Sequence, residues 1–180
     1  MKKKLTTVLA IVLVVALSVA GTYAYLTSKT ATITNTFTVG NVKIDLTETT
    51  GTEYQLIPGK VHEKNPIVTV KGGSEKCYLF VKFEENGNAA KYLDYTSLLA
   101  APDWTQGDGN KIPSNVWYRV VDKSADNTAF HLLDGDKVTI KNTVTNDNMT
   151  AASGAKLAYT AYACQFEGMT AAQAWAEVNK

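Results

Sequence analysis

The sequence predicts an all-β fold, either an antiparallel β-sandwich or a jelly roll. About eight short segments carry the alternating or β-branched patterns typical of strands, and most are joined by turn residues. No repeat and no linker divides the chain. A chain of this length can bury its own core, so we expect one domain.

The first strand is expected at residues 31–39. Ile33, Phe37 and Val39 share one face, and Thr32, Thr34, Thr36 and Thr38 form the other. Asn35 is the single polar residue on the apolar face. A second alternating strand, residues 42–46, follows the break at Gly40 and Asn41.

The other strands are identified by β-branched and aromatic content between turn signals. They are expected at residues 67–70, 77–83, 116–121, 129–133, 137–144 and 156–166. Pro58-Gly59 predicts a turn. The Asp-Gly-Asp sequence at 134–136 predicts a hairpin between the two strands around it.

Two helical segments interrupt the β pattern. Leu93, Leu98 and Leu99 lie at roughly helical spacing, which predicts a short helical excursion near 89–101 that ends at Pro102. The stretch from 103 to 115 is expected to be a surface loop. A short C-terminal helix is expected over 170–178, with Thr170 as its cap and Trp175 packed inward.

The N-terminus has the features of a secretory signal peptide, residues 1–24. Three lysines at positions 2–4 precede an apolar run, residues 5–20, that is shorter than the roughly 20 residues of a spanning helix. The small-x-small pattern at 22–24 places the cleavage site between Ala24 and Tyr25. The mature domain is then 25–180. An uncleaved membrane anchor is the alternative.

The charge balance argues against nucleic acid or anionic lipid as a partner. The signal peptide carries three lysines and no acid, so its removal changes the formal net charge from +1 to −2. A value so close to neutral gives no electrostatic attraction to a polyanion.

The two cysteines, Cys77 and Cys164, each lie inside a predicted strand. Export would make a disulfide between them chemically feasible, if their strands are neighbours. Two buried free thiols that act as small core side chains are the alternative.

The segment His62-Glu63-Lys64-Asn65-Pro66 begins like the zinc-protease motif His-Glu-x-x-His, but its fifth residue is proline. Pro66 also disfavours a helix at the preceding residue. The other histidine, His131, belongs to a different strand. No nucleophile elbow, phosphate loop or dinucleotide fingerprint is present, so an enzyme is not favoured.

No cofactor is expected. Calcium is the one ion that the acidic loops could attract, through Asp103, Asp108, Asp134 and Asp136. The chain has no EF-hand pattern, and an Asp-Gly pair is common in hairpins without any metal.

One family resemblance is specific. The lysines, the short apolar run, "GTYAYLTS" and "ATITNTFTVGNVKIDLTE" closely resemble the N-terminus of TasA and camelysin-like proteins of Gram-positive bacteria, which are exported through a SipW-type signal peptidase. "LIPG" (56–59), "YLFVKF" (78–83) and "AYTAYACQ" (158–165) match less specifically, and residues 86–153 show no clear match.

The resemblance implies a secreted jelly-roll protein of the biofilm matrix that forms fibres with itself or with related matrix proteins. The strand over 31–39, with Ile33, Phe37 and Val39 on its buried face, would complete the sheet of the next subunit. A monomer that keeps this strand within its own domain is the alternative. Other functions left open are a camelysin-like metalloprotease, whose zinc motif is not recognisable in this chain, and a surface adhesion module.

Overall fold

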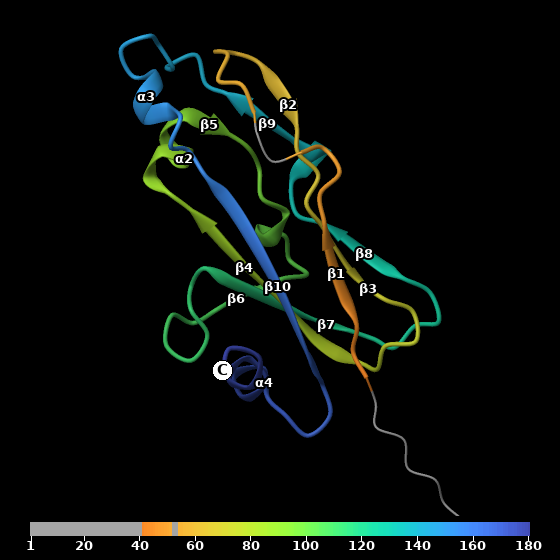
Figure 1. Cartoon of the computed structure of the whole chain (residues 1–180). Helices are drawn as coiled ribbons and strands as arrows, with labels where there is room; N and C mark the ends of the chain where they lie inside the picture. The colour runs from red at the N-terminus through yellow and green to blue at the C-terminus, as the bar shows by residue number, and fades with distance from the viewer. Residues whose placement is uncertain (1–40, 52–53) are drawn as a thin grey trace, which may run out of the picture. The chain divides into compact units, whose positions relative to one another are not determined.

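A computed structural model describes residues 41–51 and 54–180, which belong to one compact unit. This part of the chain forms ten strands in three antiparallel sheets, with three short α-helices (Figure 1). The predicted all-β, antiparallel class is therefore confirmed for the described residues.

The central layer is a four-stranded sheet in the order β10-β4-β7-β6. Its strands are β10 (Leu157–Gln165), β4 (Cys77–Glu85), β7 (Val116–Val121) and β6 (Thr105–Gln106). Six of the nine side chains of β4 are buried, and they lie on both faces of the strand, which matches its apolar sequence from Cys77 to Val81. Odd-numbered residues of β4 face one core and even-numbered residues face another.

The β3 sheet covers the odd-numbered face of the central layer. It contains β1 (Ile44–Thr47), β3 (Ile67–Val70) and β8 (Thr128–His131) in the order β1-β3-β8. Val68 and Val70 of β3 pack against the odd-numbered side chains of β4. This main core is completed by Leu99 and Leu132, both fully buried.

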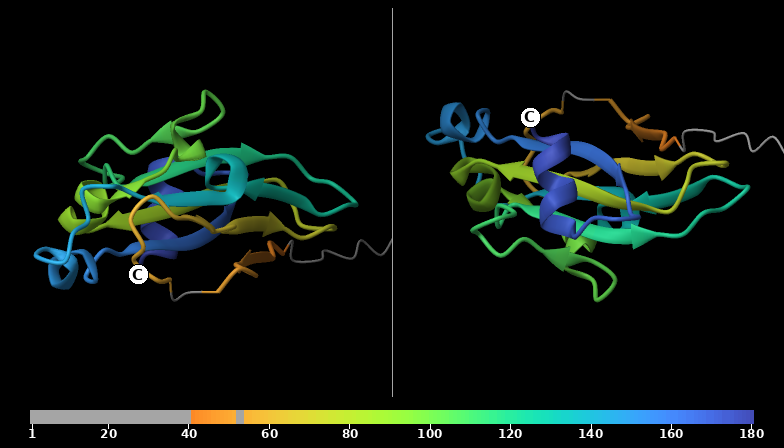
Figure 2. Two further views of the ribbon diagram at one scale, coloured as in Figure 1. Left: turned by 90° about the horizontal axis from the view of Figure 1, so that it is seen from above. Right: turned by 90° about the horizontal axis from the view of Figure 1, so that it is seen from below.

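The opposite face of the central sheet is covered by the C-terminal helix α4 (Ala171–Val178), which lies across β10 and β4 (Figure 2). Thr170 and Gln173 form a capping box at its start, as the predicted cap requires. Trp175 is 4% exposed and packs against Phe80 and Tyr162 at ring distances of 5.4 and 5.3 Å.

The third sheet, the β9 sheet, lies near the start of β10 and consists of short strands. It contains β2 (Val61–Glu63), β9 (Lys137–Ile140) and β5 (Leu93–Asp94) in the order β2-β9-β5. The helices α2 (Gly87–Tyr92) and α3 (Met149–Ala152) pack beside it. A small core of its own forms around Tyr92, Ile140, Val144 and Ala152.

The predicted hairpin at Asp134–Asp136 is wrong. This segment is a 3₁₀ turn, η2, with Gly135 and Asp136 at positive φ, and it carries the chain from the β3 sheet to the β9 sheet. β2 and β3 make the same crossing, and the Lys64 N–H donates to the Asp136 carbonyl at 2.7 Å. The connection between β8 and β9 and the connection between β2 and β3 therefore run side by side from one sheet to the other. Neither connection forms a hairpin.

The helical excursion is split. α2 ends at Tyr92, β5 follows at once, and a second 3₁₀ turn, η1 (Leu98–Ala100), comes just before the proline. Within 41–51 and 54–180, no helix is both long and apolar enough to cross a membrane.

Replacing Trp175 by alanine should lower the free energy of unfolding by about 3–5 kcal/mol, because it empties the contact between α4 and the central sheet. Urea denaturation of the protein measures this loss. Lys180→Ala, which alters a side chain 68% exposed, should stay within about 0.5 kcal/mol. A similar small change for Trp175→Ala would show that α4 does not hold the sheet.

Candidate strand-acceptor edge

β10 is bonded on one side only. The Phe166 N–H donates to the Lys76 carbonyl at 3.0 Å, and the Asn86 N–H donates to the Lys156 carbonyl at 3.3 Å. Backbone groups alternate in direction along an antiparallel strand, so the even-numbered residues of β10 bond to β4. The N–H and C=O groups of Leu157, Tyr159, Ala161 and Ala163 point to the other side, where no described strand pairs with them.

The composition of β10 does not protect this edge. Its nine residues, "LAYTAYACQ", contain no charge and no proline. Natural edge strands usually carry lysine, proline or a bulge, because unpaired backbone groups attract another strand. Eight of the nine side chains are only half-buried. β10 is therefore a long, uncharged edge that can accept a further strand.

The inner face of β10 is partly exposed where it borders β1, and we call this strip the seam. Tyr159, Ala161 and Ala163 pack at the margin of the main core, together with Ile44 of β1, and all four are partly exposed. Figure 1 shows β10 running from the α3 end to the α4 end of the described part, with β1 next to it. Two alanines on this face leave room for larger side chains.

The other sheet edges in residues 41–51 and 54–180 are shorter or closed. β2, β5 and β6 have two or three residues each. β1 has four and carries Asp45, which is paired with Lys71 at 2.8 Å. On the far side of the main core, the Arg119 guanidinium lies 4.4 Å from the Phe130 ring centre and 5.4 Å from that of Trp104. This stack links β7 to β8, and no sequence pattern indicated it.

A cavity of about 350 Å³ opens at the start of β10. Its apolar wall comes from Leu157, from the β9 sheet and from α3. The side chains on that wall are Leu56, Leu93, Val138, Ile140, Ala152 and Leu157. The open edge of β10 therefore begins at a hollow that has one apolar wall and one polar wall.

A polar cluster closes the rim of this cavity. Lys64 Nζ donates to both carboxylate oxygens of Glu48 at 2.8 and 3.0 Å, and the Tyr54 hydroxyl donates to the same carboxylate at 2.8 Å. Burial, assisted by this carboxylate, raises the pKa of Tyr54. The cluster ties the segment after β1 to the β9 sheet.

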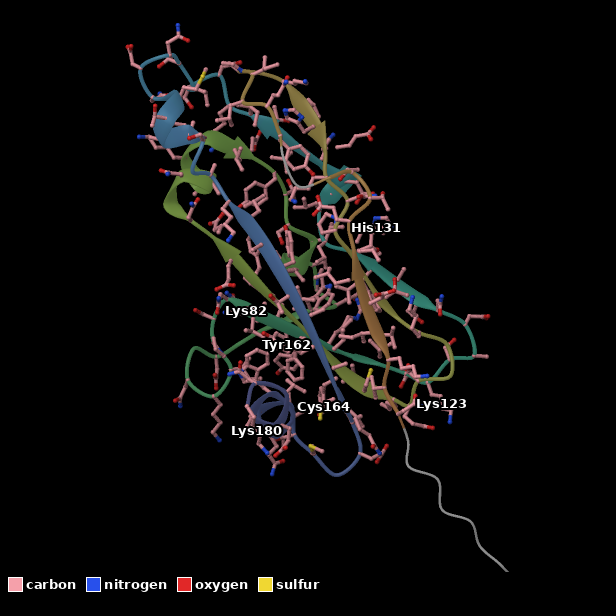
Figure 3. The ribbon with its side chains drawn as sticks, viewed as in Figure 1. Lys82, Lys123, His131, Tyr162, Cys164 and Lys180 are labelled. Carbon is pink, nitrogen blue, oxygen red and sulfur yellow. The ribbon has the colours of Figure 1, made fainter. Side chains whose placement is uncertain are left out.

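The two histidines lie apart in different surroundings. His62 is in β2, and its Nε2 lies 2.7 Å from the Gln55 carbonyl. His131 ends β8, and its Nδ1 lies 2.9 Å from both carboxylate oxygens of Asp136 (Figure 3). No group of three metal-ligating side chains occurs in 41–51 and 54–180. The described residues therefore add no further metal ligands to His62 and Glu63, the two residues that resemble the start of the zinc-protease motif.

The acidic loop residues are used within the protein. Asp108 accepts the N–H groups of Asn110, Lys111 and Ile112, and these bonds lower its pKa. Asp103 lies 3.8 Å from Arg119. Asp134 and Asp136 belong to η2, so the four aspartates considered for calcium do not converge.

Cys77 and Cys164 are free thiols. Their strands are neighbours, but Cys77 stands opposite Gln165 and Cys164 opposite Tyr78. The two side chains consequently point to opposite faces of the sheet, because Cys77 packs into the main core and Cys164 packs toward α4, as Figure 3 shows for Cys164. Of the two alternatives, the geometry shows unpaired thiols.

The residues predicted for cleavage, Ala24 and Tyr25, and those predicted for strand exchange, Ile33, Phe37 and Val39, lie outside the described residues. No protein-family model matches the chain, and no curated protein is significantly similar to it.

The two thiols should differ in reactivity. Burial raises the pKa of Cys77 to about 11, so about one molecule in a thousand carries its thiolate at pH 8. Cys164 is partly exposed. A disulfide reagent at pH 8 should therefore modify one thiol per folded subunit, and Cys164→Ser should abolish this fast reaction. Fast modification of Cys77 in that variant would contradict the buried position.

Proposed function

We propose that this chain is a secreted structural subunit of an extracellular matrix, of the TasA and camelysin-like type found in Gram-positive biofilms. After cleavage at Ala24, the strand over 31–39 of one subunit adds to the open edge of β10 in the next and forms a fibre. The two facing sheets and their crossing connections would then be the layers of a jelly roll.

The single observation that carries this proposal is the open edge of β10. Its nine uncharged residues equal in number the predicted donor strand, residues 31–39. Strand addition gives affinity through main-chain hydrogen bonds and specificity through alternate side chains. Ile33, Phe37 and Val39 would each contribute about 1.5–3 kcal/mol if fully buried in the seam.

The direction of the added strand follows from where the described chain begins. Asn41 and Lys43 bond to the loop that leads into β4, through Glu75 and Lys71. The first residue of β4, Cys77, pairs with Gln165, so the described part of the chain begins at the Gln165 end of β10.

A linear fibre requires the donor to enter at the opposite end, near Leu157. The donor then runs antiparallel to β10. In parallel addition, the body of the donating subunit would lie at the Gln165 end of the acceptor's β10. The acceptor's own N-terminal segment starts at that end too, so the two subunits could exchange strands in a closed dimer. The antiparallel arrangement is heterologous and leaves a free edge on each new subunit, so it extends into a filament.

Full overlap of the two nine-residue segments sets Ile33 opposite Ala163, Asn35 opposite Ala161 and Phe37 opposite Tyr159. The apolar face of the donor then points into the seam. Its threonines follow the other face of β10, the one on which α4 packs, which we call the outer face. Until the signal peptide is removed, the donor would be held at the membrane, which delays polymerisation until after export.

Phe37→Asp should abolish fibres and leave a folded monomer, because a carboxylate in the seam would be buried without a partner. Electron microscopy and sedimentation of the mature protein measure this. Thr36→Asp is the matched control, since it places the same charge on the outer face and should keep fibres. Filaments of the Phe37→Asp variant would refute donor-strand exchange, as would a wild-type protein that stays monomeric at high concentration.

Ala161→Pro tests the acceptor edge. The backbone N–H of Ala161 points away from β4. Proline at this position should therefore leave the fold of the subunit intact and remove one hydrogen bond to the donor. We expect a folded protein without fibres. Ala161→Ser keeps the N–H and should keep fibres. Ala158→Pro removes a bond to β4 and should destabilise the monomer itself by at least about 1 kcal/mol. Normal fibres from Ala161→Pro would place the donor elsewhere.

A further inference from the structure

The Tyr159 hydroxyl is buried without a hydrogen-bond partner among the described residues. Its ring stacks on Phe83 at 4.9 Å, on the inner face of β10 where the seam opens. A buried hydroxyl normally has a partner, because removing it from water is costly. Burial, with smaller effects of Glu48 and Glu85, raises the pKa of Tyr159, so the group is a neutral O–H that can donate or accept.

The predicted donor strand has the complementary property. Asn35 is the single polar residue on its apolar face. An amide placed in the seam needs a partner of its own. The inner face of β10 offers Leu157, Tyr159, Ala161 and Ala163 before Gln165 at its end. Among these five, Tyr159 is the polar side chain nearest the middle of the strand.

We propose that Asn35 of the incoming subunit hydrogen-bonds to the Tyr159 hydroxyl of the accepting subunit, and that this bond fixes the register of the fibre. The inference rests on the proposed function. In the full-overlap register, Asn35 stands opposite Ala161 and diagonal to Tyr159, a spacing that an aromatic side chain can span.

The bond disfavours one of the two slipped registers that keep the apolar face inward, and the shortened overlap disfavours both. A slip by one residue turns that face to solvent. A slip by two residues toward Gln165 places Asn35 opposite Ala163, beyond reach of Tyr159. A slip by two residues the other way places it opposite Tyr159 but shortens the overlap. A buried asparagine fixes register in coiled coils in the same manner.

The native thiol of Cys164 allows the register to be read directly. Cys164 lies on the outer face of β10, and in the full-overlap register it stands opposite Thr32 of the donor. In the two slipped registers it stands opposite Thr30 or Thr34. Thr30→Cys, Thr32→Cys and Thr34→Cys are therefore introduced one at a time, fibres are oxidised, and disulfide-linked ladders are measured on non-reducing gels.

We expect Thr32→Cys to cross-link at least fivefold more than Thr30→Cys or Thr34→Cys. Cys164→Ser should abolish the ladder. Adding Asn35→Val or Tyr159→Phe should raise the Thr34→Cys yield relative to the Thr32→Cys yield, since only the Thr34→Cys register separates Asn35 from Tyr159. It should also raise the critical concentration for assembly about fivefold, the loss of one hydrogen bond. Fibres with the same sharp preference in both variants would overturn the register bond.

The Phe37→Asp variant allows the monomer to be studied alone. It therefore distinguishes a role of Tyr159 in the fibre from a role in stabilising its own subunit. There, Tyr159→Phe should leave the urea midpoint unchanged or raised, because the hydroxyl has no partner inside the subunit. A clearly lowered midpoint would show an internal partner and overturn the proposal. Fibres that cross-link through none of the three cysteines would refute the register, whereas absence of fibres from every variant would refute the proposed function.

Discussion

The antiparallel ladder between β4 and β10 is the interaction on which the described structure depends. It pairs nine residues on each strand, it forms one wall of the main core, and it provides the surface on which α4 packs. The same ladder uses only half of the backbone groups of β10. The other half point outward in a regular row, so the strand that completes the fold is also the one left open to another strand.

The distribution of charge separates this edge from the others. β1 carries an aspartate that is paired with Lys71, and β7 is linked to β8 by the stacked Arg119. The remaining edges are too short to support more than one or two hydrogen-bonded pairs. β10 has neither charge nor proline to discourage pairing. A secreted monomer under selection to remain single would be expected to carry such a residue there, so its absence favours a strand that is meant to be covered.

Sequence patterns located the elements that are set by local physics. Strands 67–70 and 116–121 and the capped C-terminal helix were predicted nearly to the residue, because alternation and a capping threonine act within a few positions. The short strands β2, β5 and β6 were missed because two or three residues carry no period. The hairpin at Asp134–Asp136 failed because the pairing of β8 and β9 with distant strands overrides a local turn preference. The faces of Cys77 and Cys164 depend on register, and no local signal sets register.

In the proposed fibre, backbone hydrogen bonds and side-chain contacts would contribute differently to the choice of register. A donor and an acceptor of equal length lose one hydrogen-bonded pair for each two-residue slip, and each net hydrogen bond is worth only about 0.5–1.5 kcal/mol. In the proposed fibre, Ile33, Phe37 and Val39 would meet Ala161 and Ala163 in more than one alignment, since alanine leaves a shallow, repeated surface. The backbone and the apolar face therefore favour burial without strongly favouring one alignment. A polar pair in the seam adds a penalty for every alignment that separates the two groups, because each is then buried alone. Such a pair limits the number of competing structures more than it increases the strength of binding, and an ordered fibre requires that limit.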